Sequence, residues 1–99
     1  GVERVEQRPE CSSVYAQYTI KIENREKIQE GMQKLGIPTA VHYPVPLNEQ
    51  PAYRYKSRHY ETPVASQIAK KVLSLPMGPD LTRENMQNIV NSLLDIINE

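Results

Sequence analysis

Hydrophobic and polar residues alternate in the first patterned stretch of the chain. Tyr18, Ile20 and Ile22 fall on one face of an extended chain, and polar residues lie between them. A period of two residues is typical of a strand with one buried face, so the pattern predicts a strand within residues 14–22. Residues 1–13 mix charged residues with a proline and serines, and we expect them to form a linker or a frayed N-terminus.

A helical period follows directly. Ile28, Met32 and Leu35 recur at i, i+4 and i+7, which places them on one helix face. Asn24 stands at the N-cap position, and Gly36 stands where helices often end in the left-handed conformation. The sequence therefore predicts a first helix between Asn24 and Gly36.

Two more amphipathic helices are predicted in the second half of the chain. One begins at Thr62 and Pro63, since a proline at the first helical position loses nothing by lacking an N–H. Its apolar stripe comprises Val64, Ala65, Ile68, Ala69 and Val72. The other helix is capped by Thr82. Its expected core face comprises Met86, Ile89, Val90, Leu93, Leu94 and Ile97.

Short extended segments at residues 39–43 and 73–77 complete the predicted fold. The order strand–helix–strand–loop–helix–strand–helix favours an α/β fold of the α+β two-layer sandwich type. We expect a small three-stranded sheet covered on one face by about three helices. Residues 44–61 are rich in proline and tyrosine without clear periodicity, and a loop of this length is often functional.

The composition narrows the class of function. The chain has 99 residues, enough for one small domain, and 12 Lys plus Arg balance 12 Asp plus Glu. A zero net charge argues against a surface for nucleic acid or an anionic membrane. Only 38% of the residues are hydrophobic, which is low for a soluble domain. Either the domain is marginally stable, or another body covers part of its surface.

Several kinds of site and location are not expected from the sequence. The single cysteine, Cys11, cannot form an internal disulfide, and no Cys/His cluster has the spacing of metal ligands. No glycine-rich phosphate loop or hydrolase motif is present. No apolar run reaches the roughly 18 residues of a membrane span, and the charged N-terminus is unlike a signal peptide, so we expect a cytoplasmic protein.

One polar pair stands out as candidate chemistry. His42 and Tyr43 end the predicted strand, and Pro44 and Pro46 stiffen the turn that follows. Such a turn can hold hydrogen-bonding side chains ready for a polar ligand. In the alternative interpretation, His42 caps the strand and Tyr43 packs in the core, and the residues alone leave both open.

Three blocks of sequence, taken together, point to a family. They are G-I-P-T-A-V-H-Y-P-V-P-L at residues 36–47, Q-P-A-Y at residues 50–53 and L-S-L-P-M at residues 73–77. With the strand around Tyr18, their order and gaps resemble the C-terminal region of the DegT/DnrJ/EryC1/StrS family of sugar aminotransferases, which use pyridoxal phosphate. The resemblance runs from Ser13 to Leu94, roughly four fifths of the chain.

The resemblance implies that residues 14–99 form the small C-terminal domain of the fold-type I aminotransferase architecture. In that family a large N-terminal domain supplies the Schiff-base lysine and most groups that hold the cofactor phosphate. No lysine of this chain matches that motif, so we expect no catalytic and no cofactor-binding residue here, and an inert fragment on its own. The complete enzyme is expected to join this chain to its own large domain and to form a homodimer.

The resemblance also implies a substrate. It favours the branch that aminates a UDP-linked 2-acetamido-3-keto-glucuronate, with glutamate as amino donor, for bacterial surface polysaccharide such as lipopolysaccharide. His42 and Tyr43 match positions that contact the nucleotide sugar, and they are the substrate-binding residues expected here. Asn48 stands where many relatives have a second histidine, and an amide cannot carry a proton near neutral pH.

Two other interpretations start from the same residues. The chain could be a stand-alone α/β binding or interaction module without catalysis. It could also be a ferredoxin-like nucleic-acid binder, which the zero net charge and the lack of a basic stripe on the first strand disfavour.

Overall fold

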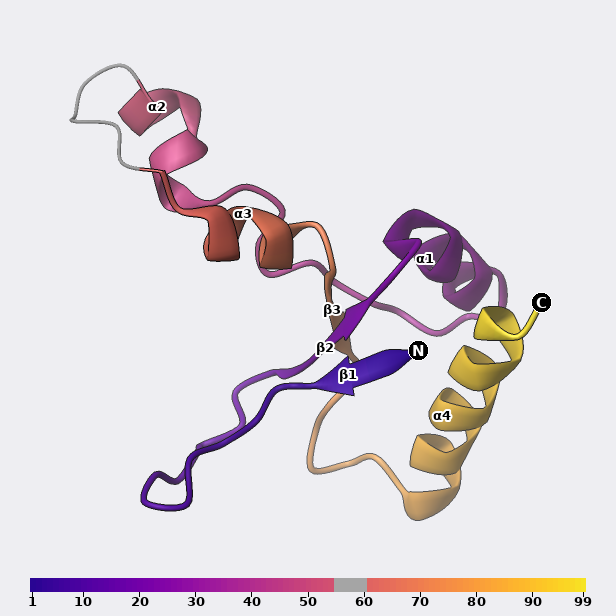
Figure 1. The fold of residues 1–99 in the computed structure, drawn as a ribbon. Helices are drawn as coiled ribbons and strands as arrows, with labels where there is room; N and C mark the ends of the chain where they lie inside the picture. The colour runs from indigo at the N-terminus through magenta and orange to yellow at the C-terminus, as the bar shows by residue number, and fades with distance from the viewer. Residues whose placement is uncertain (55–60) are drawn as a thin grey trace.

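The computed structural model describes residues 1–54 and 61–99. A small sheet, two long helices and a series of shorter turns make up the fold (Figure 1). In chain order the elements are β1 (Val2–Arg4), β2 (Tyr18–Ile22), α1 (Arg25–Lys34), the 3-10 turn η1 (Leu47–Glu49), α2 (Pro51–Arg54), α3 (Pro63–Ala69), β3 (Val72–Leu75) and α4 (Arg83–Ile97).

The sheet has three antiparallel strands in the order β1-β2-β3, which confirms the predicted fold class. Its membership differs from the prediction at both edges. Residues 1–13 were expected to be a linker, but β1 lies within them and pairs Val2 with Ile22. Only three residues pair, too few to show an alternating pattern in the sequence.

The strand expected at residues 39–43 is reduced to one bridge. Ala40 and Ser74 exchange backbone hydrogen bonds, with N···O distances of 3.1 and 2.7 Å. Pro38 and Pro44 flank this segment, and neither can donate a ladder hydrogen bond, so the pairing does not extend. The bridge nevertheless fixes where the chain enters the following loop.

The core lies between the sheet and the pair of long helices, α1 and α4 (Figure 1). Ile20 of β2, Met32 of α1 and Leu73 of β3 are its most deeply buried side chains. Leu35, predicted on the same helix face as Met32, is instead 57% exposed. Its place in the core cluster is taken by Ile37, beyond the end of the helix.

The exchange of Leu35 for Ile37 follows from how α1 ends. Gly36 adopts the left-handed conformation with φ of 75°, as its position predicts. The Gly36 N–H donates to the Gln33 carbonyl and the Ile37 N–H donates to the Met32 carbonyl, at 3.0 and 2.9 Å. This paired termination turns the chain so that the apolar residue after glycine packs back onto the helix.

The predicted core face of α4 is only partly buried. Ile89 and Leu93 are buried as predicted, and Ile96 joins them. Met86, Val90 and Leu94 form a second line along the helix and remain 44–48% exposed. The helix contacts its partners along one narrow stripe. Close contact is possible at Gly31 of α1, where an added Cβ would lie 2.9 Å from Ile96 Cδ1.

The predicted helix that begins after Thr62, which is α3, does not join the layer formed by α1 and α4. Ala69 is its only buried residue, and Val64 is 70% exposed. Two helices, rather than about three, therefore provide the core side chains of the helical layer. The guanidinium of Arg25 in α1 links α3 to the sheet edge by donating to the carbonyls of Ala69 and Val72.

Of the predicted helix caps, the one on α4 is confirmed, and those before α1 and α3 make no side-chain cap hydrogen bond. Thr82 caps α4 as expected, since its hydroxyl accepts from the Asn85 N–H at 3.0 Å. Asn24 precedes α1 as predicted but makes no side-chain cap, because its backbone is left-handed with φ of 54°. Thr62 precedes α3 without a side-chain cap and uses its hydroxyl elsewhere.

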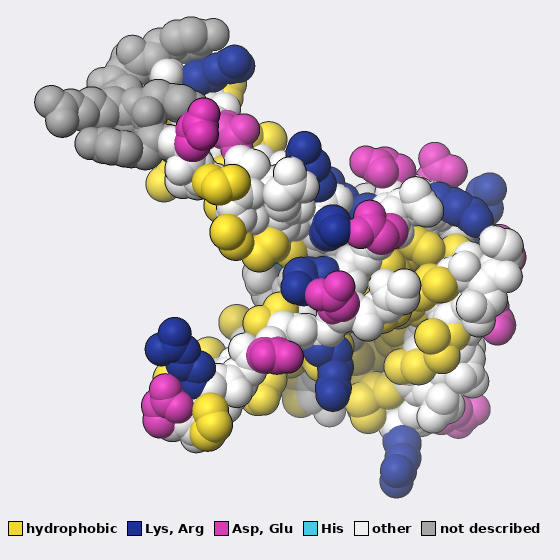
Figure 2. Space-filling view, in the orientation of Figure 1, with side chains coloured by type: hydrophobic (Ala, Val, Ile, Leu, Met, Phe, Trp, Pro, Cys, Tyr) yellow, Lys and Arg dark blue, Asp and Glu magenta, His cyan; other side chains and the backbone are white. Residues whose placement is uncertain are grey.

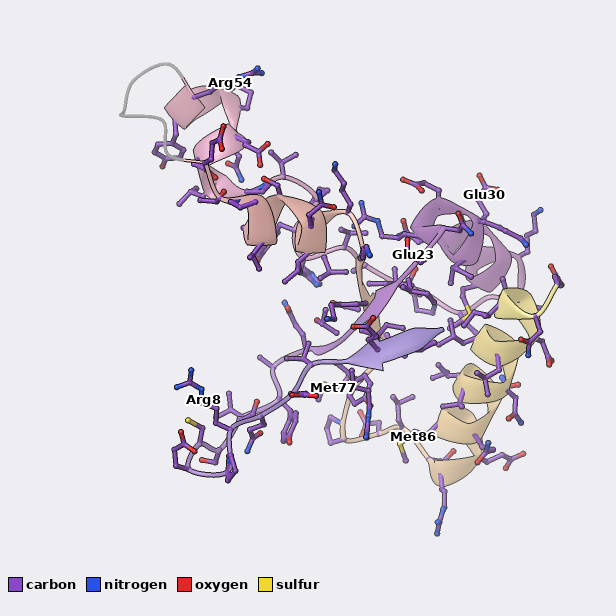
Figure 3. The ribbon with its side chains drawn as sticks, viewed as in Figure 1. Arg8, Glu23, Glu30, Arg54, Met77 and Met86 are labelled. Carbon is purple, nitrogen blue, oxygen red and sulfur yellow. The ribbon has the colours of Figure 1, made fainter. Side chains whose placement is uncertain are left out.

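Two arms project from the sheet on the side away from α4 (Figure 1). The first arm is residues 5–17, and the second arm is the described part of residues 44–70, with η1, α2 and α3. Arg8 lies near the tip of the first arm and Arg54 near the tip of the second (Figure 3). The radius of gyration of 15.7 Å exceeds the roughly 13 Å of a compact domain of this length because of these arms.

Adjacent leucines of α4 provide a test of the core. Leu93→Ala is expected to lower the free energy of unfolding by about 2–5 kcal/mol, because Leu93 is 4% exposed and its truncation leaves a cavity. Leu94→Ala, the matched control at 45% exposure, is expected to cost less than about 1 kcal/mol. Urea unfolding of both variants measures the difference, and equal losses would contradict the assigned helix face.

The pairing of β1 provides a test that depends on pH. Glu3 lies directly opposite Lys21, and their charged groups are 2.8 Å apart. The hydrogen bond and the charge of Lys21 lower the pKa of the Glu3 carboxyl. The carboxylate therefore adds stability above its ordinary pKa, and this stability is lost as pH falls through the lowered value.

Glu3→Gln is accordingly expected to be slightly less stable than the parent at pH 7 and equally stable near pH 2. Glu10→Gln in the first arm is the control. Thermal unfolding at both pH values measures the difference. If Glu3→Gln matched Glu10→Gln at pH 7, the Glu3–Lys21 ion pair would add no stability and the expectation would be contradicted.

Candidate functional site

The candidate site lies on the sheet face that points away from α1 and α4. Because side chains alternate along a strand, Thr19 and Lys21 of β2 point away from the core that Ile20 and Ile22 enter. In the register of β2 and β3, Thr19 lies opposite Ser74. This second face is polar, and it receives the side chain of His42.

His42 is half-buried and hydrogen-bonded to the sheet. Its Nδ1 atom lies 3.0 Å from the Ser74 hydroxyl oxygen, and that oxygen lies 3.0 Å from the Thr19 hydroxyl. His42 follows the Ala40 bridge by two residues, so the bridge brings the imidazole over Ser74. The predicted alternative of His42 as a strand cap does not describe this contact, which is made to a side chain.

Tyr43 stands beside His42 at the surface. The two rings meet edge to face, with their centroids 5.4 Å apart at an angle of 82°. Tyr43 is 68% exposed, which excludes the alternative in which it packs in the core. The structure therefore brings together the two residues that the sequence singled out, with the imidazole bonded to the sheet and the phenol exposed to solvent.

The pair lines a groove of about 520 Å³ at the base of the second arm. Val45 and Leu47 line it from the loop, and Ile68 and Ala69 line it from α3. The remaining lining residues are Pro46, Gln50, Ala65 and Val72. The groove is thus mainly apolar, with an imidazole, a phenol and one amide as its polar groups, which is the usual make-up of a small-molecule site.

Asn48 does not line this groove. Its side-chain oxygen accepts a hydrogen bond from the Thr62 hydroxyl at 3.3 Å. Nearby, the Ser66 hydroxyl donates to the Glu49 carboxylate at 2.8 Å. Asn48 therefore ties the loop to the start of α3. Of the loop expected at residues 44–61, residues 55–60 lie outside the described residues.

A second hollow lies along the first arm. It measures about 980 Å³ and is lined mainly by polar and charged residues, among them Arg4 of β1 and Glu6 and Arg8 of the arm, together with Tyr18 and Thr19 of β2. The space-filling view shows an open gap between the two arms (Figure 2), but no residue of the second arm lines this hollow. Positive and negative side chains mix among its lining residues, so the hollow favours no ligand of one charge.

The sequence interpretation missed Ser74 and Thr19. Among the described residues, Ser74 is the polar residue that is buried, with 5% exposure. Its signal was present in the L-S-L-P-M block, where one hydroxyl interrupts an otherwise apolar strand. Its partner was not evident, because Thr19 and Ser74 are 55 positions apart.

The groove beside His42 does not fit a pyridoxal phosphate site. Such a site needs an unpaired lysine beside a cluster of phosphate-binding donors. The groove beside His42 is lined by no lysine and no carboxylate. Lys21 and Lys71 are paired with Glu3 and Glu23, at 2.8 and 2.6 Å. Within residues 1–54 and 61–99 no group of His, Cys, Asp and Glu side chains could hold a metal ion, and no helix is long and apolar enough to cross a membrane.

Known proteins resemble this chain over nearly its whole length. The model of the DegT/DnrJ/EryC1/StrS aminotransferase family matches residues 1–94. A Pseudomonas aeruginosa protein named UDP-2-acetamido-2-deoxy-3-oxo-D-glucuronate aminotransferase is 46% identical over 81 residues, which are 82% of this chain and 22% of that protein. The erythromycin biosynthesis protein EryC1 of Saccharopolyspora erythraea is 34% identical over 94 residues, 94% of this chain and 26% of its own length.

Solved structures agree with the sequence matches. A DegT/DnrJ/EryC1/StrS aminotransferase from Brucella abortus superposes with a TM-score of 0.88 at 31% identity, covering 99% of this chain and 26% of that one. DesV of S. venezuelae, solved in complex with a ketimine intermediate, gives a TM-score of 0.88 at 26% identity, with coverages of 100% and 27%. The chain thus spans about a quarter of the length of these relatives, and it belongs to the DegT/DnrJ/EryC1/StrS aminotransferase family.

Proposed function

We propose that this chain is the C-terminal part of an aminotransferase that moves an amino group from glutamate to the keto carbon of a nucleotide sugar. The proposed acceptor is UDP-2-acetamido-3-keto-glucuronate, and the proposed pathway builds bacterial surface polysaccharide. Support for the acceptor comes from the relative whose name contains this sugar, which is 46% identical to this chain. The cofactor is pyridoxal phosphate, which supplies the electron sink for amino transfer and is bound by residues outside this chain.

The observation that carries the proposal is the placement of His42 and Tyr43. Both line the groove, His42 is fixed through Nδ1, and Tyr43 is exposed beside it. The second imidazole nitrogen and the phenol are thereby left to meet a ligand. A keto sugar linked to a diphosphate offers mostly hydrogen-bond acceptors, and donors that meet charged acceptors make the stronger hydrogen bonds.

The remaining lining of the groove suits the less polar parts of such a ligand. Val45, Leu47 and Ile68 provide apolar surface for ring carbons or an acetamido methyl group, and Gln50 supplies an amide. In this proposal the chain binds and orients the sugar and excludes water from it. It does not carry the amino group.

A stand-alone binding module is the second candidate. The observation in its favour is that residues of this chain alone form the groove. The two candidates predict different coding sequence upstream of this chain. We expect the reading frame of the aminotransferase to extend about 250 codons upstream, the size of a large cofactor domain, and to encode a Schiff-base lysine there.

The first prediction from this proposal concerns the cofactor. The 99-residue chain, mixed with pyridoxal phosphate and reduced with borohydride, is expected to give no lysine labelled in stoichiometric amount. Mass spectrometry of the intact chain and of its peptides makes the measurement. The complete enzyme, treated in the same way, is the positive control. One fully labelled lysine in the isolated chain would overturn the assignment of the cofactor to other residues.

The second prediction concerns substrate contact in the complete enzyme. His42→Ala removes one hydrogen bond to a charged or polar acceptor, worth roughly 1.5–3 kcal/mol, so kcat/KM is expected to fall about 10- to 150-fold. Tyr43→Phe keeps the ring and removes the hydroxyl, and a loss of about tenfold is expected if the hydroxyl meets the sugar. Steady-state kinetics with glutamate and the keto nucleotide sugar make the measurement.

Controls separate contact from folding in this experiment. Gln33→Ala, on the exposed side of α1, is expected to leave kcat/KM unchanged. Melting temperatures of all variants are measured in parallel. Normal kcat/KM with a large fall in melting temperature for both site variants would return His42 and Tyr43 to a purely structural role.

A further inference from the structure

A pair of hydroxyl groups, buried Ser74 and half-buried Thr19, lies behind His42. Ser74 is 5% exposed, in the middle of β3, and its oxygen is 3.0 Å from both the Thr19 hydroxyl and His42 Nδ1. No buried side-chain nitrogen or oxygen of the described residues lacks a hydrogen-bond partner. The three polar groups thus form one continuous chain from β2, through β3, to the loop that carries the imidazole.

The backbone holds this chain of groups in register. Ser74 lies directly opposite Thr19 in the β2–β3 ladder, and its own N–H and carbonyl are both bonded to Ala40. Ser74 is therefore fixed on two sides by neighbouring backbone. Its hydroxyl has little freedom to turn to another partner, whereas His42 stands in a loop outside any strand or helix.

The hydrogen count shows what the pair can do for the imidazole. A hydroxyl carries one hydrogen and can also accept, so Ser74 can donate to Nδ1 while accepting from Thr19. In this arrangement His42 carries its own hydrogen on Nε2, where it can be donated to a substrate oxygen. In the opposite arrangement Nδ1 donates to Ser74, Ser74 donates to Thr19, and Nε2 accepts from a substrate hydroxyl. In both arrangements the bond at Nδ1 leaves Nε2 for the substrate.

We propose that Ser74, supported by Thr19, is a positioning residue that holds the His42 imidazole through Nδ1, so that Nε2 is directed at the sugar substrate. This inference rests on the proposed function, in which His42 contacts that substrate. Ser74 itself touches no substrate, because it is buried behind the imidazole and does not line the groove. Its effect on the reaction passes through His42.

The alternative is that Ser74 only stabilises the sheet. The two roles differ in whether the effect of Ser74 depends on His42. If Ser74 only stabilises the sheet, its replacement lowers kcat/KM by the same factor with and without the imidazole. A positioning serine has nothing left to position once His42 is alanine, so the two losses would not add.

The experiment is a double-mutant cycle in the complete enzyme, with kcat and KM measured separately for the keto nucleotide sugar. Ser74→Ala is expected to lower kcat/KM about 3- to 10-fold, the value of one neutral hydrogen bond. In the His42→Ala background the same change is expected to have less than about a twofold effect. Ser66→Ala, which removes another serine hydroxyl from a side-chain hydrogen bond outside the groove, is the matched control.

Conservative variants complete the design. Ser74→Thr retains the hydroxyl and is expected to restore most of the activity lost in Ser74→Ala. Position 74 is buried, so its variants can disturb folding. A second pair of variants, at half-buried Thr19, therefore tests the same chain of hydrogen bonds. Thr19→Val keeps the shape and removes the hydroxyl, and it is expected to lower kcat/KM by about 2- to 3-fold, whereas Thr19→Ser should not.

The outcomes separate this inference from the proposed function. If His42→Ala lowers kcat/KM while Ser74→Ala and Thr19→Val do not, the positioning role is wrong and the substrate contact stands. If Ser74→Ala costs as much in the His42→Ala background as in the parent, Ser74 acts independently of His42 and the inference is again wrong. If His42→Ala leaves kcat/KM unchanged, the substrate contact fails and the positioning role fails with it.

Discussion

The antiparallel pairing of β2 with β3 organises both faces of this chain. It aligns Ile20 with Leu73 on one face, where they meet α1 and α4, and Thr19 with Ser74 on the other. A shift of one residue in this register would turn the apolar residues of one strand to the polar face and its polar residues into the core. The hydrophobic core and the hydroxyl pair behind His42 are thus set by the same set of backbone hydrogen bonds.

Sequence patterns predicted the features that depend only on neighbouring residues of the chain. The end of α1 depends on Gly36 and the residues beside it, and the start of α4 depends on the hydroxyl of Thr82, so both could be predicted. Core membership was harder, because it depends on what lies across from a helix. Ile96 is buried and Leu94 is not, since contact with α1 selects one of two apolar lines on α4.

The same distinction holds for the site. His42 and Tyr43 could be predicted as a pair from their place beside two prolines and from the family motif. The contact of His42 with Ser74 spans 32 positions and depends on the single bridge at Ala40, so no local pattern shows it. β1 was missed for a related reason, as a three-residue strand is defined by its partner more than by its own sequence.

His42 lies between the polar face of the sheet and the groove. This position explains how a loop with little regular structure can hold a well-defined side chain. On one side the imidazole meets a hydroxyl fixed in the sheet, and on the other it lines a groove with largely apolar walls. A hydrogen bond next to such walls competes with less water than one at an open surface, and it is correspondingly stronger. One bond to a rigid strand can then orient the ring, although the loop itself has only one backbone bridge to the sheet. The polar face of the sheet therefore supports His42 from behind, whereas Tyr43 contacts the imidazole edge to face and is otherwise largely exposed.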